Sequence, residues 1–136
     1  MTAVAPRAPA LKPLRHAHAW LGAWICALLA TVVASLLPVF LLPVVPPGGD
    51  KFEHLGGYAV LAAAAVQLFA GRIALWRAAV GLVALGVALE IAQGVFTTTR
   101  QMDAMDALAN TGGVVLGMAT ALTPLRDLLL RMQPRN

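Results

Sequence analysis

Charged residues are scarce in this chain of 136 residues: only 12% are Asp, Glu, Lys or Arg, while 60% are hydrophobic. The mean hydropathy of +0.78 lies outside the range of ordinary soluble domains. A single cysteine, Cys26, excludes a disulfide framework. The net charge is +4, but the basic residues flank apolar segments, which argues against nucleic-acid binding. The composition therefore predicts one small integral membrane domain over residues 1–136.

Four apolar stretches predict four transmembrane helices joined by short loops. They lie at 17–42, 54–70, 73–96 and 106–125, each near the length that a bilayer requires. The first stretch is longer than the apolar core of a signal peptide, so we expect it to be retained as a span. Pro38 should kink or end the first helix, and the Pro/Gly-rich stretch after it predicts a surface loop. We expect an all-α integral membrane fold.

Basic residues lie mainly on one side of the predicted bundle. Eight of the ten fall at the termini and between the second and third spans: Arg7, Lys12, Arg15, Arg72, Arg77, Arg126, Arg131 and Arg135. Only Lys51 and Arg100 fall on the other side. The positive-inside rule therefore predicts that both termini are cytoplasmic, and Trp20, Trp24 and Trp76 lie near that interface as aromatic anchors would.

Polar side chains gather at the opposite, extracytoplasmic ends of the last three predicted helices. The candidate residues of this polar pocket are Asp50, Lys51, His54, Glu90, Gln93, Arg100, Asp103, Asp106 and Asn110. Polar groups at membrane depth are costly, so a cluster of them predicts a functional site. Spacings of three and four residues place them on one face of each helix. On the fourth helix this face continues into Gly113 and Gly117, a pair that allows close helix packing.

The charge balance of the pocket favours a cation or a proton. Five carboxylates face only Lys51 and Arg100, and crowding of this kind is relieved by protonation, a bound cation or pairing, such as Glu90 with Arg100. Glu90 is the deepest carboxylate, and His54 is suited to acid–base chemistry near neutral pH. With one histidine and no cysteine in the pocket, zinc is poorly supplied with ligands. We assign no metal site or cofactor from the sequence, although oxygen-coordinated Mg²⁺ or Ca²⁺ would suit the carboxylates.

Helix capping offers a simpler role for some of these acids. Asp50 and Glu53 have the spacing of a capping box for the second helix, and Asp103 and Asp106 can cap the fourth. For Asp50 and Asp106, capping and a pocket role are compatible. Capping does not explain Glu90, because it lies toward a helix C-terminus, where the helix dipole disfavours an anion.

Three motifs carry a resemblance to a known family. They are D-K-x-x-H at 50–54, E-x-x-Q at 90–93 and R-x-x-D-x-x-D-x-x-x-N-x-x-G-x-x-x-G at 100–117. In this order, and at the ends of predicted spans, they resemble the VanZ-like family of small bacterial membrane proteins. The resemblance implies a multispan protein of the bacterial inner membrane with its motif residues on one side. It also implies a cell-envelope role linked to teicoplanin tolerance, without supplying a reaction.

Two classes of function fit these observations. The first is a binding or accessory module that lies in the lipid bilayer and presents its pocket to a lipid-linked or cell-wall ligand at the outer leaflet. The alternative is an intramembrane enzyme that acts on a lipid-linked substrate by carboxylate and histidine acid–base chemistry. Ion translocation is less favoured, because the inner halves of the spans lack a matching polar path.

Overall fold

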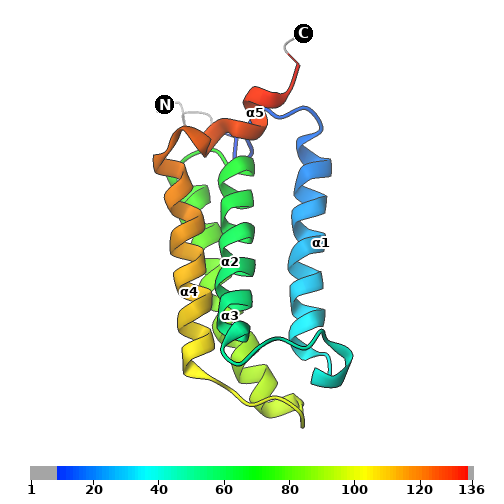
Figure 1. Cartoon of the computed structure of the whole chain (residues 1–136). Coiled ribbons are helices and arrows are strands. Elements are labelled where there is room, and N and C mark those ends of the chain that lie inside the picture. Colours follow the sequence, from blue (N-terminus) through cyan, green and yellow to red (C-terminus); the bar gives the residue numbers. More distant parts are fainter. Residues whose placement is uncertain (1–8, 135–136) are drawn as a thin grey trace, which may run out of the picture.

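Helices make up the regular structure of residues 9–134, the part of the chain that the computed structural model describes, apart from an isolated β-bridge between Leu11 and Phe69. Four long helices run alternately in opposite directions (Figure 1). They are α1 (Ala17–Leu36), α2 (Gly49–Leu68), α3 (Arg72–Phe96) and α4 (Ala104–Ala119). The shorter elements are η1 (Val39–Leu41), η2 (Thr120–Leu122), η3 (Pro124–Asp127) and α5 (Leu128–Met132).

The alternation of helix direction gives the bundle two chemically different ends. The starts of α2 and α4 and the ends of α1 and α3 share one end, which we call the acidic end because it holds Asp50, Glu53, Glu90, Asp103 and Asp106. The start of α1, the α2–α3 turn and α5 share the other, the basic end, with Lys12, Arg15, Arg72, Arg77, Arg126 and Arg131. Arg7 and Arg135, also assigned to this side from the sequence, lie outside the described residues. Within residues 9–134, five of the six carboxylates thus lie at the acidic end and six of the eight Lys and Arg residues at the basic end.

Two helix boundaries near the acidic end differ from the predicted ones. α1 ends at Leu36 instead of residue 42, because Pro38 forces the residue before it, Leu37, into an extended conformation (φ −66°, ψ 144°). α2 begins at Gly49 instead of residue 54, after Gly48 adopts φ 80° as the N-cap. Asp50 therefore lies inside the first turn of the helix, and the predicted capping box of Asp50 with Glu53 is wrong.

The fourth helix is shorter than the predicted span of 106–125. It ends at Ala119, and after the η2 turn the chain bends by 82° into η3 and α5. Thr123 and Pro124 account for the bend: the Thr123 hydroxyl accepts the Leu125 N–H (N···O 3.2 Å), and Pro124 occupies the first turn of the new helix. The segment η3–α5 consequently lies across the basic end of the bundle (Figure 1).

The closest packing in the bundle is between α2 and α4. A Cβ atom on Gly113 would overlap the Leu55 carbonyl oxygen, and one on Gly117 would overlap the Ala59 carbonyl oxygen. The two helix backbones therefore touch along this glycine stripe. Beside it lies the apolar core, formed by Tyr58, Leu61, Ala62, Leu82 and Val114.

α1 lies at the edge of this core: Trp24 and Leu28 pack against it, but none of the 20 residues of α1 is buried. Near the basic end the Trp24 indole donates a hydrogen bond to the Leu61 carbonyl (2.9 Å) and packs edge-on against Phe69. Near the acidic end Gln93 donates to the Ser35 carbonyl (2.9 Å). Trp24, predicted as an interfacial anchor, thus also ties α1 to α2.

The length and apolar character of the helices indicate a membrane protein. α1 and α3 are long and apolar enough to cross a bilayer, and α4 with its bent continuation provides a third candidate. A helix as apolar and as little buried as α1 has no protein partner for most of its surface, which is the condition of a helix in contact with lipid.

Candidate functional site: a polar cluster at the acidic end

The predicted site residues come from three helices that meet at the acidic end. α2 supplies Asp50, Lys51 and His54 from its first two turns, α3 supplies Glu90 and Gln93 from its last turns, and the start of α4 supplies Asp103, Asp106 and Asn110. Because α3 runs opposite to α2 and α4, its C-terminal residues reach the same level as their N-terminal ones.

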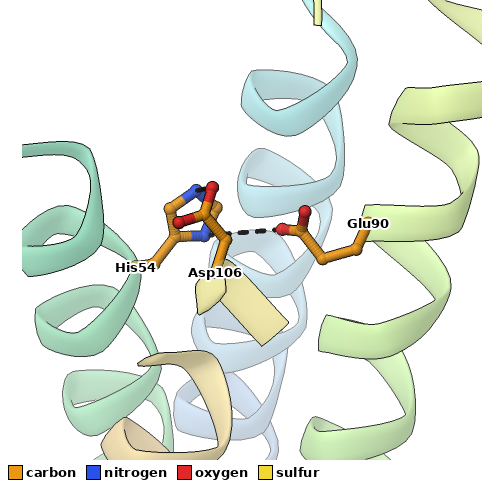
Figure 2. Close-up of side chains that lie close together, drawn as sticks. All are labelled: His54, Glu90 and Asp106. Atoms are coloured by element: carbon orange, nitrogen blue, oxygen red, sulfur yellow. Dashed lines mark ion pairs between the residues drawn. The ribbon is translucent and has the colours of Figure 1, made fainter. Parts of the chain in front are cut away.

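Three of these side chains point toward one another: His54, Glu90 and Asp106 (Figure 2). One donor atom from each lies within 4.8 Å of the others. His54 Nδ1 is 3.9 Å from Glu90 Oε1, and His54 Nε2 is 3.7 Å from Asp106 Oδ2. Both separations are too long for hydrogen bonds. The three side chains therefore surround a shared point but are not hydrogen-bonded to one another. We call these three residues the triad.

Glu90 is the most buried member of the triad, with 2% of its surface exposed. Its Oε2 accepts the Asp103 backbone N–H (3.3 Å). Its Oε1 has no hydrogen-bond partner within the described residues. Buried carboxylate oxygens are nearly always paired, so the free oxygen directed into the triad requires a physical explanation.

Asn110 fixes the orientation of His54. Its Oδ1 lies 3.0 Å from His54 Nδ1, so Nδ1 acts as the donor and the unprotonated nitrogen of the neutral ring is Nε2. Asn110 is itself 2% exposed, and it fits because Gly86 on α3 has no side chain: a Cβ there would lie 3.0 Å from Asn110 Cβ. The predicted interhelical role of Asn110 is therefore combined with positioning of the imidazole.

Lys51 covers the outer side of the triad. Its Nζ lies 2.8 Å from Asp103 Oδ2, 2.9 Å from Asp106 Oδ1 and 3.7 Å from Asp50 Oδ2. The hydrogen bond from Lys51 lowers the pKa of Asp103, which lies just before α4.

Asp103 has a second contact, as the N-cap of α4. Its Oδ1 accepts the Met105 backbone N–H at 2.8 Å, which confirms the predicted cap. Asp106 lies one turn further on, with its carboxylate bonded to Lys51 and not to the helix terminus.

Three of the predicted pocket residues form no side-chain hydrogen bond or ion pair with the triad within residues 9–134: Asp50, Gln93 and Arg100. The Gln93 side chain points to α1, where it bonds to Ser35. Asp50 is about half exposed (48%) and forms an ion pair with Lys51. Arg100 forms no ion pair within residues 9–134, so the predicted pairing of Glu90 with Arg100 is wrong; the carboxylate of Glu90 faces His54 instead.

Tyr58 is a further polar residue near this level that was not included among the site residues. It lies one helical turn after His54, is 3% exposed, and its hydroxyl has no hydrogen-bond partner within the described residues. The signal in the sequence was its spacing of four residues from His54, which placed it on the same helix face. An aromatic residue in an apolar helix also fits plain packing, and so this signal was not distinctive.

No protein-family model, curated protein or solved structure matches this chain. The function is therefore argued from the cluster itself.

Proposed function

We propose that the chain is a four-span protein of the bacterial inner membrane with its basic end in the cytoplasm and its acidic end outside. Six cations lie at the basic end among residues 9–134, and Lys51 and Arg100 lie at the other. Such segregation follows the positive-inside rule. α2 completes the set of four, because it lies beside α4 and carries its charged residues only in its first turns.

We further propose that it acts as a VanZ-like binding or accessory module of the cell envelope, linked to teicoplanin tolerance. In this role the triad contacts a lipid-linked or cell-wall ligand at the outer leaflet. The order of the D-K-x-x-H, E-x-x-Q and R-x-x-D motifs supports the family assignment. The triad supports the binding role, because it concentrates three ionisable groups that helix capping does not require.

A single observation carries this proposal: the buried Glu90 carboxylate has one oxygen directed at His54 and Asp106 without a partner. A carboxylate that served only to hold helices together would be expected to have both oxygens paired. An unpaired, buried and oriented oxygen is better explained as a contact for something that the protein binds.

The runner-up is an intramembrane enzyme that acts on a lipid-linked envelope substrate. The observation in its favour is that the imidazole lies between two carboxylates with its tautomer set by Asn110, an arrangement suited to general acid–base catalysis. The binding role is preferred because the triad contains no serine, threonine or cysteine nucleophile.

Glu90→Gln tests the proposal, since it keeps the shape of the side chain and removes the charge. Expressed in a glycopeptide-susceptible bacterium, the wild-type protein should raise the minimal inhibitory concentration of teicoplanin. Glu90→Gln should abolish the increase while the protein stays monodisperse and helical in detergent. Glu53→Gln makes the same change on an exposed carboxylate of the same end and should keep the increase.

Retention of tolerance by Glu90→Gln would contradict a functional Glu90. Lipid extracts from the same strains separate the two candidate functions. A modified envelope lipid that depends on Glu90 would favour the enzyme, whereas an unchanged lipid profile with lost tolerance would favour the binding module.

A further inference from the structure

The spacing of the triad matches that of ligands around one metal ion. Zinc is held at about 2.0–2.2 Å by imidazole nitrogen and carboxylate oxygen, so two ligands of one ion lie roughly 3–4.4 Å apart. The separation of 3.7 Å from His54 Nε2 to Asp106 Oδ2 falls in this range. Glu90 Oε1 lies 3.9 Å from the other ring nitrogen, Nδ1, and one donor atom from each of the three residues lies within 4.8 Å of the others. We propose that His54, Glu90 and Asp106 form a binding site for one divalent transition-metal ion. Zn²⁺ is the ion used to test this site.

Each triad residue has one atom that is held by a neighbour and one that is free. His54 Nδ1 is bonded to Asn110, Glu90 Oε2 to the backbone of Asp103, and Asp106 Oδ1 to Lys51. The remaining atoms, His54 Nε2, Glu90 Oε1 and Asp106 Oδ2, form no hydrogen bond within residues 9–134. Outer contacts of this kind orient the ligands of metal sites in proteins.

The burial of Glu90 is a separate argument for a cation. A carboxylate that is 2% exposed and leaves one oxygen unpaired bears a desolvation cost that no hydrogen bond offsets. Lys51 does not supply the missing contact, because its ammonium group is bonded to Asp103 and to the outer oxygen of Asp106. A divalent ion at the shared point would pair the free oxygen and balance both triad carboxylates.

The donor set favours a transition metal over Mg²⁺ or Ca²⁺, which the sequence alone had suggested. Of the five carboxylates at this end, Asp50, Glu53 and Asp103 do not belong to the triad. One imidazole and two carboxylates remain, and imidazole is a ligand of Zn²⁺ and its neighbours, whereas Mg²⁺ and Ca²⁺ prefer oxygen ligands alone.

Three protein ligands leave at least one coordination position for an external oxygen. This deepens the proposed function and rests on it: a metal-bound position would accept an anionic group, such as a phosphate of an envelope lipid, that five carboxylates alone would repel.

Metal titration of the purified protein tests the site. Wild-type protein in detergent, stripped with EDTA, is titrated with Zn²⁺ by calorimetry, and the thermal unfolding temperature is followed in parallel. We expect one ion per chain and a raised unfolding temperature, unaffected by excess Mg²⁺. Glu90→Gln and His54→Gln should each weaken Zn²⁺ binding by at least about tenfold. The control Glu53→Gln should bind as the wild type does.

Equal Zn²⁺ affinity in the wild type and both triad variants would overturn the site, as would equal loss in Glu53→Gln. Because a triad variant can fail to fold, Co²⁺ absorption of the wild-type protein gives a second measurement. Ligand-field bands that appear at one equivalent support the site, and their absence overturns it.

Failure of the metal site and failure of the proposed function give different results. If Zn²⁺ does not bind while Glu90→Gln still abolishes tolerance, the binding module stands without the metal. If Zn²⁺ binds to the triad while Glu90→Gln keeps tolerance, the site stands and the proposed function falls.

Discussion

At the scale of single residues, the two lysines Lys12 and Lys51 lie at opposite ends of the bundle, and each is paired with aspartate. Lys12 is 5% exposed, and its ammonium group lies 2.8 Å from Asp127 Oδ1 and 2.5 Å from the Arg126 carbonyl oxygen. Lys51 is paired with Asp103 and Asp106. Lys12 thus joins the segment before α1 to η3, and Lys51 joins α2 to the start of α4.

The ion pair of Lys12 with Asp127 should make stability depend on pH. The hydrogen bond from Lys12 lowers the pKa of Asp127 in the folded protein, so its contribution is present in full above the unfolded pKa of about 3.9 and is lost as the pH falls through the folded value. Asp127 is 46% exposed, and solvent screens the pair. We therefore expect Asp127→Asn to cost about 1 kcal/mol at neutral pH.

Unfolding in detergent at a series of pH values checks this expectation. The difference in unfolding free energy between wild type and Asp127→Asn should be full at pH 7 and close below about pH 4. Glu53→Gln, whose carboxylate forms no ion pair within residues 9–134, should show no such closing difference. A difference for Asp127→Asn that is the same at all pH values would contradict a charged pair.

The sequence was sufficient to predict which polar side chains lie at the same level of the bundle, because this depends only on their positions within the spans. His54, Glu90 and Asp106 were placed at one level by their positions at span ends, and the structure brings them together. The partner of Glu90 was not predictable, because pairing with Arg100 or His54 depends on how the α3–α4 loop turns. The burial of Lys12 was missed for a similar reason, since its partner follows the fourth helix.

At the scale of elements, the pairing of α2 with α4 determines where the triad can form. The glycine stripe brings the two backbones into contact, and this contact follows directly after His54 on α2 and begins two turns after Asp106 on α4. Boundaries were predicted within one residue at both ends of α3. They failed where proline, glycine or threonine stops a helix inside an apolar run, as at Pro38 and Thr123, because hydropathy does not register such stops.

Adding one methyl group to the glycine stripe tests the importance of this contact. In Gly113→Ala the new Cβ would overlap the Leu55 carbonyl oxygen, and neither backbone can move without separating the helices. We expect a loss of about 1–3 kcal/mol, the usual cost of overpacking. The adjacent Gly112→Ala is the matched control: its Cβ would meet only Leu55 Cδ1 at 3.9 Å, so it should gain up to about 1 kcal/mol from helix propensity.

SDS-induced unfolding of the two variants, compared with wild type, gives the measurement. Equal stability of Gly112→Ala and Gly113→Ala would mean that the helices are free to move apart at this level. The same preparation also shows whether Zn²⁺ binding weakens in Gly113→Ala, as it should if the α2–α4 contact positions the triad.

At the scale of the whole molecule, the segregation of charge along the bundle axis makes the orientation testable. Cys26 is the sole cysteine of the sequence, so Cys26→Ala provides a background for labelling. Thr98→Cys places a thiol in the exposed α3–α4 loop at the acidic end, and Met132→Cys places one at the basic end. A membrane-impermeant maleimide should label Thr98→Cys in intact cells and Met132→Cys only after permeabilisation. The reverse pattern would invert the proposed topology.

The bend after α4 brings the transverse segment η3–α5 into contact with the end of α2, the helix that carries Lys51 and His54 at its other end. Gln67, near the end of α2, donates to the Leu125 carbonyl and accepts the Leu129 N–H, which fastens the transverse segment η3–α5 to this helix. Lys51 and His54 lie on the same helix, roughly 20–25 Å away at 1.5 Å per residue. The transverse segment and the imidazole are thus held by opposite ends of one continuous helix.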